Sequence, residues 1–202
     1  ISVRDLSIAY EGTTALDEVS LDIFEDDFLG VIGPNGGGKT SLVRAILGNI
    51  PYRGTVNYAA ELFRGKERLI GYLPQQNVFD RAFPISVTET VLSGLQGHKR
   101  FRSRYTAEDR RRALELLERT GIAEVAGRAI GEISGGQMQR ALLCRAIISE
   151  PRLLILDEPT ASLGEGEVAP FLEFVKSLRD ELDMAILFIS HKLEEVYEIS
   201  DT

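Results

Sequence analysis

The feature that most constrains this chain is the eight-residue stretch Gly33–Thr40, with the sequence GPNGGGKT. It follows a short apolar run, Phe28–Ile32, and precedes a helical pattern, Ser41–Leu47, that ends at Gly48. A strand, a glycine-rich loop and a helix, in that order, are the context that the pattern G-x-x-x-x-G-K-[ST] requires. Glycines let backbone N–H groups approach a phosphate closely, and the N-terminus of the following helix adds partial positive charge. The stretch is therefore predicted to be a phosphate-binding loop.

The Lys-Thr pair at the end of this loop indicates a nucleoside triphosphate with its magnesium ion. The Lys39 ammonium can reach the β- and γ-phosphates, and the Thr40 hydroxyl can ligate Mg²⁺. A glycine-rich turn that holds nothing is disfavoured, because a chain can turn without such a pair. The residues predicted to contact the phosphates are Gly33, Pro34, Asn35, Gly36, Gly37, Gly38, Lys39, Thr40 and Ser41.

The composition sets limits on the class of protein. The 202 residues are 44% apolar and 27% charged, which is typical of one globular domain with a sizeable core. The net charge of −8 argues against a nucleic-acid protein, whose binding face is expected to be basic. The single cysteine, Cys144, cannot form an intrachain disulfide, and its apolar helical context predicts a buried thiol. No apolar run approaches the roughly 20 residues of a membrane span, and no signal peptide is visible. We expect a cytoplasmic protein that can still lie against a membrane through a partner.

The first part of the chain carries strand signals. The segment Ile1–Tyr10 partly alternates between apolar and polar residues, and Ala15–Ile23 alternates well in its second half. These two segments predict an antiparallel β layer ahead of the phosphate loop. Tyr10 ends the first strand and can stack on an adenine ring, although a half-exposed strand tyrosine is the favoured interpretation of that residue alone.

Two further strands are predicted after the first helix, at Gly54–Tyr58 and Leu69–Leu73. Pro74 cannot donate to a sheet ladder, so the second strand should end there. Gln75 then lies at the strand end, near where a parallel sheet places its ligand. The alternative is an ordinary solvated glutamine.

From about residue 77 the pattern becomes helical. Ser86–Glu89 fits a capping box, and the helix that it begins is expected to run to about Gly97. Thr106–Asp109 is a similar helix start, and this helix should stop at Gly121.

The segment Lys99–Arg112 carries seven Lys/Arg and two Asp/Glu. Such a run can be a docking patch for an acidic partner or for lipid headgroups, but a solvated helix-and-loop face is the favoured interpretation. Phe101 and Tyr105 interleave the cations, which leaves nucleic-acid binding as a minor alternative.

A second glycine-rich helix start follows at Ser134, Gly135, Gly136 and Gln137. Ser134 and Gln137 again form a capping box, and the helix should run from Met138 to about Ser149. Glycine costs about 1 kcal/mol relative to alanine within a helix, so two glycines in the first turn suggest that something approaches closely. A phosphate bound by the free N–H groups and a simple capped helix both remain open.

The apolar run Leu153–Leu156 ends in two carboxylates, Asp157 and Glu158. A run that is apolar throughout predicts a central parallel strand, whose carboxyl end should lie beside the phosphate loop. There Asp157 can organise the Mg²⁺ shell, and Glu158 can polarise a water for in-line attack on the γ-phosphate. The alternative is an acidic strand end that turns at Pro159.

The remaining segments predict an amphipathic helix at Glu167–Asp183 and a buried strand at Ala185–Ile189, followed by a further helix. His191 follows this strand. It can hydrogen-bond a γ-phosphate at the end of a strand parallel to that of Asp157, although a lone histidine is more often structural.

Taken in order, these residues resemble the ATP-binding cassette of ABC transporters over essentially the whole chain. The ordered set is the phosphate loop, Gln75, Ser134–Gln137, the strand that ends in Asp157 and Glu158, and His191. The later motifs are weak alone, but the set in this order is highly specific.

The resemblance implies roles for the matching positions. Tyr10 would stack on adenine, Ser134–Gln137 would bind the ATP held by a second copy, and two cassettes would close over two ATPs. Gln75 would also sense the membrane subunit, and His191 would contact the γ-phosphate. The catalytic set would be Lys39, Gln75, Glu158 and His191, and the Mg²⁺ set would be Thr40, Gln75 and Asp157.

The fold expected from this resemblance is α/β, a P-loop NTPase of ABC type. It has a RecA-like core with a mixed or parallel sheet, an N-terminal antiparallel β layer and an inserted helical subdomain. One ATPase domain spans residues 1–202. Residues 1–76 and 150–202 form the nucleotide-binding core with its β layer, and residues 77–149 form the mostly helical subdomain.

The segment Asn77–Val87 looks like that of cassettes in the manganese, zinc and iron import subfamily, which often carry Phe-Pro-Ile-(Ser/Thr)-Val after the glutamine. Such importers pair the ATPase with an integral-membrane permease and an extracytoplasmic substrate-binding protein. The resemblance therefore implies a peripheral protein on the inner face of the membrane, with no nucleic acid as partner. The transported metal would not touch this chain.

Two positions depart from the family pattern. Ile133 replaces the leucine that usually precedes the signature serine, which is a mild change. Gly164 stands where the family commonly has an aspartate that couples the two ATP sites, so that coupling is in question.

Two other classes were weighed. A cytosolic ABC-type ATPase acting on nucleic acid or ribosomes would use the Lys99–Arg112 segment, but the chain has neither a heptad insertion nor a second cassette. A P-loop kinase or GTPase leaves Ser134–Gln137 unexplained and lacks a guanine-reading Asn-Lys-x-Asp.

Overall fold

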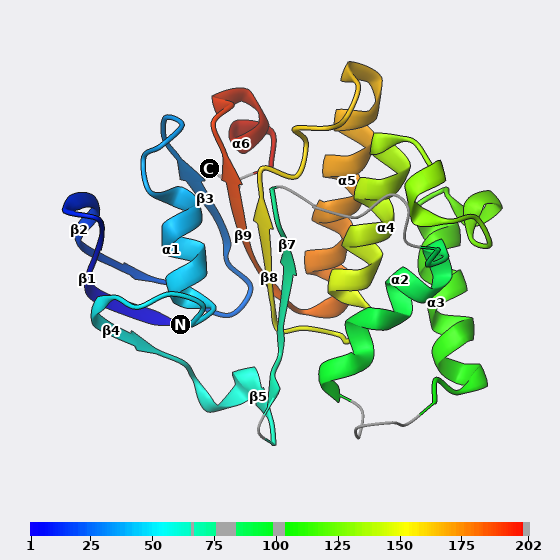
Figure 1. Ribbon diagram of the computed structural model, residues 1–202, viewed down its shortest axis with the longest axis horizontal. Helices are drawn as coiled ribbons and strands as arrows, with labels where there is room; N and C mark the ends of the chain where they lie inside the picture. The colour runs from blue at the N-terminus through cyan, green and yellow to red at the C-terminus, as the bar shows by residue number, and fades with distance from the viewer. Residues whose placement is uncertain (66, 76–83, 99–103, 200–202) are drawn as a thin grey trace.

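The computed structural model describes residues 1–65, 67–75, 84–98 and 104–199. A four-stranded parallel sheet lies at the centre, between an antiparallel sheet beside the N-terminus and a group of helices (Figure 1). The central sheet has the order β3-β9-β8-β7 and consists of β3 (Phe28–Ile32), β7 (Ile70–Leu73), β8 (Leu153–Asp157) and β9 (Ala185–Ser190). The four strands that the apolar runs predict are thereby confirmed.

The two middle strands of this sheet are buried on both faces, because helices cover one side and the β layer with α1 covers the other. Every residue of β8 and β9 is buried. Alternate residues divide between two hydrophobic clusters. Leu154 and Phe188 pack with the helices, whereas Ile155 and Leu187 pack with the β layer. This two-sided burial is why the strands are apolar throughout rather than alternating.

Helix α1 (Lys39–Ile46) lies on the face of the sheet that the β layer also covers. Its buried residues Leu42, Val43 and Ile46 pack in the same cluster as Leu6 of β1. Helices α4 (Gly135–Ile147), α5 (Glu165–Leu182) and α6 (Leu193–Ile199) cover the other face. Figure 1 shows that α1 and α4 both begin at the end of the sheet where the strand arrowheads lie.

The predicted antiparallel β layer is confirmed as a three-stranded sheet of order β2-β1-β4. Its strands are β1 (Ser2–Tyr10), β2 (Thr13–Asp22) and β4 (Arg53–Asn57). A short 3₁₀ turn at Ala60–Leu62 then leads to the small hairpin of β5 (Phe63–Arg64) and β6 (Glu67–Arg68).

The helical part contains α2 (Val87–Leu92) and α3 (Ala107–Arg119), with 3₁₀ turns at Ser93–His98, Ala123–Val125 and Ile130–Glu132. Both capping boxes predicted here, at Ser86 and Thr106, are present. These elements form a separate hydrophobic cluster with the outer face of α4, and Cys144 lies fully buried in it. Burial raises the pKa of the Cys144 thiol to about 12, so this cysteine is the core residue that the pattern predicts.

Several helix boundaries differ from the sequence prediction. Helix α1 begins at Lys39 rather than Ser41, and α4 begins at Gly135 rather than Met138. The helix after Ser86 becomes 3₁₀ at Ser93, because Gly94 lies directly against α4: a Cβ here would be 2.0 Å from the Arg145 carbonyl oxygen. Helix α5 begins at Glu165, two residues earlier than predicted, and includes Pro170 in its second turn. The segment from residue 77 to residue 83, which carries the subfamily resemblance together with 84–87, lies outside the described residues.

Two of the four described cations of the basic segment, Arg111 and Arg112, pair with acidic side chains. Arg111 pairs with Glu108 and Glu115 on the exposed face of α3, and the Arg112 guanidinium donates to the Ile148 carbonyl and to Glu150. This arrangement matches the favoured interpretation, a solvated helix face. Residues 99–103 of the segment lie outside the described residues.

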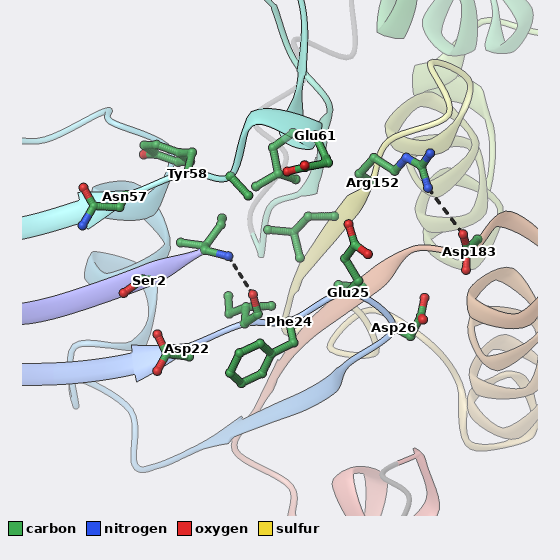
Figure 2. Close-up of a pocket in the computed structure, with 16 residues that line it drawn as sticks. Ser2, Asp22, Phe24, Glu25, Asp26, Asn57, Tyr58, Glu61, Arg152 and Asp183 are labelled. Atoms are coloured by element: carbon green, nitrogen blue, oxygen red, sulfur yellow. Dashed lines mark hydrogen bonds and ion pairs between the residues drawn. The ribbon is translucent and has the colours of Figure 1, made fainter.

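A cavity of about 740 Å³ lies at the amino ends of the central strands, where Leu153 and Ala185 begin β8 and β9 (Figure 2). Its apolar lining is rimmed mainly by carboxylates such as Glu25 and Asp26, and the Arg152–Asp183 ion pair closes one side. In the described part of the chain, no helix is both long and apolar enough to cross a membrane.

Candidate active site

The phosphate loop joins β3 to α1 and depends on glycine at the helix start. Gly38 is the N-cap of α1, with φ +82°, in the left-handed region that disfavours other residues. A Cβ here would lie 2.5 Å from the Ala15 carbonyl oxygen and 2.6 Å from the Leu16 side chain. No side chain caps this helix, so the first N–H groups of α1 are left to face the loop. The loop therefore has the backbone shape of an anion cradle.

Lys39 folds back into this cradle. Its ammonium donates to the carbonyl oxygens of Gly33 at 2.7 Å and Pro34 at 3.0 Å, and lies 3.7 Å from Glu158 Oε1. Both charged side chains are over 90% buried. A buried cation held mainly by two carbonyls has weak neutral partners that phosphate oxygens can replace with charged ones.

Glu158 joins the lysine to His191. The imidazole Nδ1 lies 2.7 Å from Glu158 Oε2, and the histidine side chain is 39% exposed. Glu158 has φ +47°, a left-handed conformation that costs a non-glycine residue roughly 1–3 kcal/mol. A backbone bond of 2.9 Å from its N–H to the Ile189 carbonyl holds it there. Glu158 and His191 thus meet because β8 and β9 are neighbours in the sheet.

Asp157 ends β8 beneath the loop and is only 1% exposed. Neither of its carboxylate oxygens has a hydrogen-bond partner among the described residues. Burial raises the pKa of Asp157, and the neighbouring Glu158 charge adds to that effect, while the Thr40 hydroxyl opposes it. A buried carboxylate without a partner is costly unless a cation satisfies it. The pair of oxygen donors from Asp157 and Thr40 is chemically suited to Mg²⁺, which prefers oxygen ligands and keeps phosphate or water in its other positions. In the described part of the chain, no group of three or more His, Cys, Asp or Glu could hold a transition metal.

A cavity of about 310 Å³ brings most of the predicted site residues together. Tyr10 forms one edge, 45% exposed, and its hydroxyl donates to Ser41 Oγ at 3.2 Å. Gln75 reaches the same cavity from the end of β7. The lining residues are Tyr10, Ala15, Asn35, Gly36, Gly37, Gly38, Lys39, Thr40, Ser41, Gln75 and Glu158.

The second glycine-rich helix start is built differently. The Gln137 N–H donates to Ser134 Oγ at 3.2 Å, and the Ser134 N–H donates to Gln137 Oε1 at 3.0 Å, so the predicted capping box is confirmed. A Cβ on Gly136 would lie 2.4 Å from a carboxylate oxygen of Glu167, which also accepts from the Gly164 N–H at 3.1 Å. None of Ser134–Gln137 lines the cavity at the phosphate loop.

Two residues at the site were missed by sequence reasoning. Ala15, on β2, lines the cavity, and its carbonyl oxygen lies close to Gly38. Glu195 is buried against Thr160 and Ser190, whereas Glu194, its neighbour on the same helix, is exposed. An alanine in a strand carries no chemical signal. The only hint for Glu195 is its spacing beside Val196 and Ile199, the buried positions of the same short helix.

The family model described as "ABC transporter" matches residues 16–161, from within β2 to the turn that follows Glu158. This covers more than half of the chain. The chain belongs to the ABC transporter family.

Curated relatives extend this match to the whole chain. The ABC cassette is 35% identical to the high-affinity zinc uptake system ATP-binding protein ZnuC of Bacillus subtilis (strain 168), covering 100% of this chain and 88% of that protein. It is 34% identical to the manganese transport system ATP-binding protein MntB of Halalkalibacterium halodurans, covering 100% of this chain and 80% of that protein.

Solved structures show the same fold. The cassette aligns with a metal-chelate type ABC transporter in an inward-facing conformation with a TM-score of 0.85 and 30% identity, over 98% of this chain and 75% of that one. It aligns with an ATP-binding cassette of an ABC transporter in its ADP conformation with a TM-score of 0.78 and 25% identity, over 99% and 84% of the two chains. The expected fold class is confirmed, and the chain is an ATP-binding, ATP-hydrolysing subunit of the ABC type. A P-loop kinase or GTPase is excluded.

Proposed function

We propose that this ATPase subunit powers the uptake of a transition metal ion, manganese, zinc or iron, through a separate membrane permease. The observation that carries the ATPase chemistry is the contact of the buried Lys39 and Glu158 with each other and with His191, next to the buried Asp157, whose oxygens have no hydrogen-bond partner among the described residues. The cargo is supported by the names of relatives that match the full length of the chain, which are zinc and manganese transport subunits. Those names favour a transport role over a cytosolic ATPase acting on nucleic acid or ribosomes.

In this proposal, nucleotide binding begins with Lys39. Its ammonium leaves the Gly33 and Pro34 carbonyls, and transfers to the β- and γ-phosphate oxygens. The N–H groups of residues 36–41 surround the phosphates, and Tyr10 stacks against the adenine at the open edge of the cavity. Thr40 and Asp157 would hold Mg²⁺, with Gln75 completing the protein's share, and the ion would neutralise phosphate charge. The hydrogen bonds from Lys39 to two neutral carbonyls are weaker than those to charged phosphate oxygens, so the exchange favours nucleotide binding.

Hydrolysis in this proposal depends on Glu158. Movement of Lys39 to the phosphates releases one side of the Glu158 carboxylate, which then accepts a hydrogen bond from a water at the γ-phosphate. His191 Nδ1 donates to the other oxygen of Glu158, which lies 2.7 Å away, and a ring protonated on both nitrogens can also donate to the γ-phosphate from Nε2. The two residues together orient the attacking water in line with the bond that breaks.

A complete site requires a second copy in this proposal. Ser134–Gln137 line no cavity with the phosphate loop of their own chain, and their helix points its N-terminus toward the same end of the molecule as α1 (Figure 1). Two copies facing each other would bring each signature helix to the ATP of its partner. The permease would hold this dimer at the inner face of the membrane, and an extracytoplasmic substrate-binding protein would deliver the metal.

The test is the metal content of the native host. Cells that express wild-type protein or the Glu158→Gln variant at equal levels are analysed for Mn, Zn and Fe. We expect one metal to fall selectively in the variant, because a subunit that does not hydrolyse ATP cannot drive its import. A selective rise would indicate export and contradict the proposal, and no change in any metal would remove metal transport while leaving the ATPase intact.

A further inference from the structure

A buried carboxylate lies behind the Glu158–His191 pair. Glu195 of α6 is 5% exposed. The single proton of the Thr160 hydroxyl is donated to this carboxylate, whose two oxygens lie 2.8 and 2.7 Å from the hydroxyl oxygen. The Ser190 hydroxyl donates to the same carboxylate at 2.9 Å, and the Lys192 ammonium donates at 2.9 Å. Burying a carboxylate is unfavourable unless donors replace its water, and three side chains do so here.

The donors come from the two loops that carry the proposed reacting residues. Thr160 lies two positions after Glu158, in a turn closed by a 3.2 Å bond from the Ala161 N–H to the Glu158 carbonyl. Ser190 directly precedes His191. The paired residues of β8 and β9 end at Asp157 and Ile189, and one further backbone bond, from the Glu158 N–H to the Ile189 carbonyl, lies just beyond them. Glu195 links the two chain segments just beyond the point where the ladder ends.

The carboxylate is an anion at neutral pH. Burial alone would raise the pKa of Glu195, but the hydrogen bonds from Lys192, Thr160 and Ser190 outweigh it and hold the pKa below its usual range. Glu195 therefore offers charged acceptors to both hydroxyls, and such bonds are about twice as strong as neutral ones. The residue does not line the nucleotide cavity, so it has no direct contact with bound nucleotide there.

We propose that Glu195 is a positioning residue for hydrolysis, which holds the Thr160 and Ser190 segments together and so keeps the His191 imidazole against Glu158. This inference rests on the proposed roles of Glu158 and His191. It adds a residue outside the sequence motifs to the machinery of the site. It also gives a role to a charged side chain on the buried side of a short helix.

The first experiment compares three variants by steady-state ATP hydrolysis. Glu195→Gln keeps the shape but removes the charge, and Thr160→Val removes one donor at similar volume. Glu194→Gln, an exposed carboxylate on the same helix, is the matched control. A displacement near 1 Å at reacting groups costs up to about 10²-fold in rate. We expect kcat to fall by roughly 10-fold or more in Glu195→Gln and by less in Thr160→Val, with KM for ATP within about twofold. Glu194→Gln should match wild type.

A double-mutant cycle separates positioning from a general loss of structure. Glu195→Gln is combined with His191→Ala, and the rate loss is compared with that in the His191-containing protein. If Glu195 acts through His191, it adds little once the imidazole is gone. An undiminished loss in that background, or no loss in either, overturns the proposal.

A second readout does not depend on turnover. The chain has two histidines, His98 and His191, so His98→Gln assigns the His191 ring signal in an NMR spectrum of labelled protein. We expect Glu195→Gln to shift or broaden the His191 signal, and Glu194→Gln to leave it unchanged. An unchanged His191 signal in Glu195→Gln overturns the proposal.

The two readouts distinguish this inference from the proposed function. If His191→Ala hydrolyses ATP at the wild-type rate, the catalytic role of His191 is wrong, and the inference is wrong as a statement about catalysis even where the ring signal moves. If His191→Ala is slow but Glu195→Gln is normal, the proposed function stands and the inference alone fails.

Discussion

The two glycine-rich helix starts of this chain, at α1 and α4, look alike in sequence and differ in structure. At α1 the N-cap is Gly38 with φ +82° and no side-chain cap, and a buried lysine lies in the hollow that the loop forms. At α4 the N-cap is Ser134 in extended conformation, and its hydroxyl and the Gln137 amide satisfy two backbone N–H groups. The first has groups that need a ligand, whereas the second is stable as it stands.

Because of this difference, a single copy of the chain is expected to bind ATP at only one of the two helix starts. The α1 end has a cation, a helix start without a side-chain cap, and a buried carboxylate without a hydrogen-bond partner in the described residues. The α4 end has neutral caps and no such charge in its first turn. We therefore expect one copy to bind ATP at α1, and α4 to contribute only when a second copy faces it.

The largest effect should come from Lys39→Met, which removes the charge and keeps the apolar stem. Hydrogen bonds between charged groups contribute about 1.5–3 kcal/mol, so ATP affinity of the isolated chain should fall by roughly 10- to 100-fold. Ser134→Ala is the matched change at the other helix start and should leave that affinity unaltered. Titration with a fluorescent ATP analogue at low protein concentration measures both, and an equal loss in the two variants would contradict the contrast.

The next effect concerns glycine at the two starts. Gly38→Ala meets the Ala15 carbonyl at 2.5 Å and adopts a positive φ, so it should lower the free energy of unfolding by about 2 kcal/mol or more. Gly36 has a similar φ of +80°, and a Cβ there would have no neighbour within 4 Å. Gly36→Ala should therefore lower the free energy of unfolding only by the cost of the positive φ, about 1 kcal/mol.

At α4, Gly135→Ala meets only the Ser162 carbonyl at 3.3 Å and has an ordinary helical backbone. It should change stability by less than about 1 kcal/mol, since alanine also favours the helix. Urea denaturation of the three variants tests the ranking. A Gly135→Ala loss as large as that of Gly38→Ala would show that α4 is as constrained as α1.

The smallest effect is expected at Asp157. Burial raises the folded-state pKa of Asp157, so the folded protein retains this proton to higher pH than the unfolded chain does. Stability from this group is therefore present at low pH and is lost as the pH rises above about 4, through the folded-state pKa. Asp157→Asn replaces the carboxylate with a neutral side chain, so the variant has no buried charge at high pH. It should stabilise the nucleotide-free protein by about 1 kcal/mol at pH 8 and by little at pH 4.

Thermal denaturation at the two pH values, with and without ATP and Mg²⁺, measures this effect. Asp157→Asn should also lose the part of ATP stabilisation that depends on Mg²⁺. If Asp157→Asn were less stable than wild type at pH 8 without nucleotide, the interpretation that Asp157 is a buried carboxylate without a partner would be contradicted.

Much of the fold could be predicted because the strands of the central sheet are buried on both faces. Continuous apolar runs such as Leu153–Leu156 identify such strands without further information. The capping boxes at Ser86, Thr106 and Ser134 could also be predicted from short stretches of sequence, since each involves two side chains within one turn. Helix ends set by distant packing were not predictable, as the change to 3₁₀ at Ser93 shows: it depends on how Gly94 meets α4.

The sequence by itself determined the identity of the site, because a phosphate loop needs its glycines, lysine and threonine within eight consecutive positions. Tertiary structure alone decided the relations between separate segments. Strand order places Glu158 beside His191, folding of β2 brings Ala15 against Gly38, and burial of α6 turns Glu195 toward Thr160 and Ser190. The physical reason is that backbone turns and caps are satisfied within a few residues, whereas a buried charge must be satisfied by whichever residues packing brings to it.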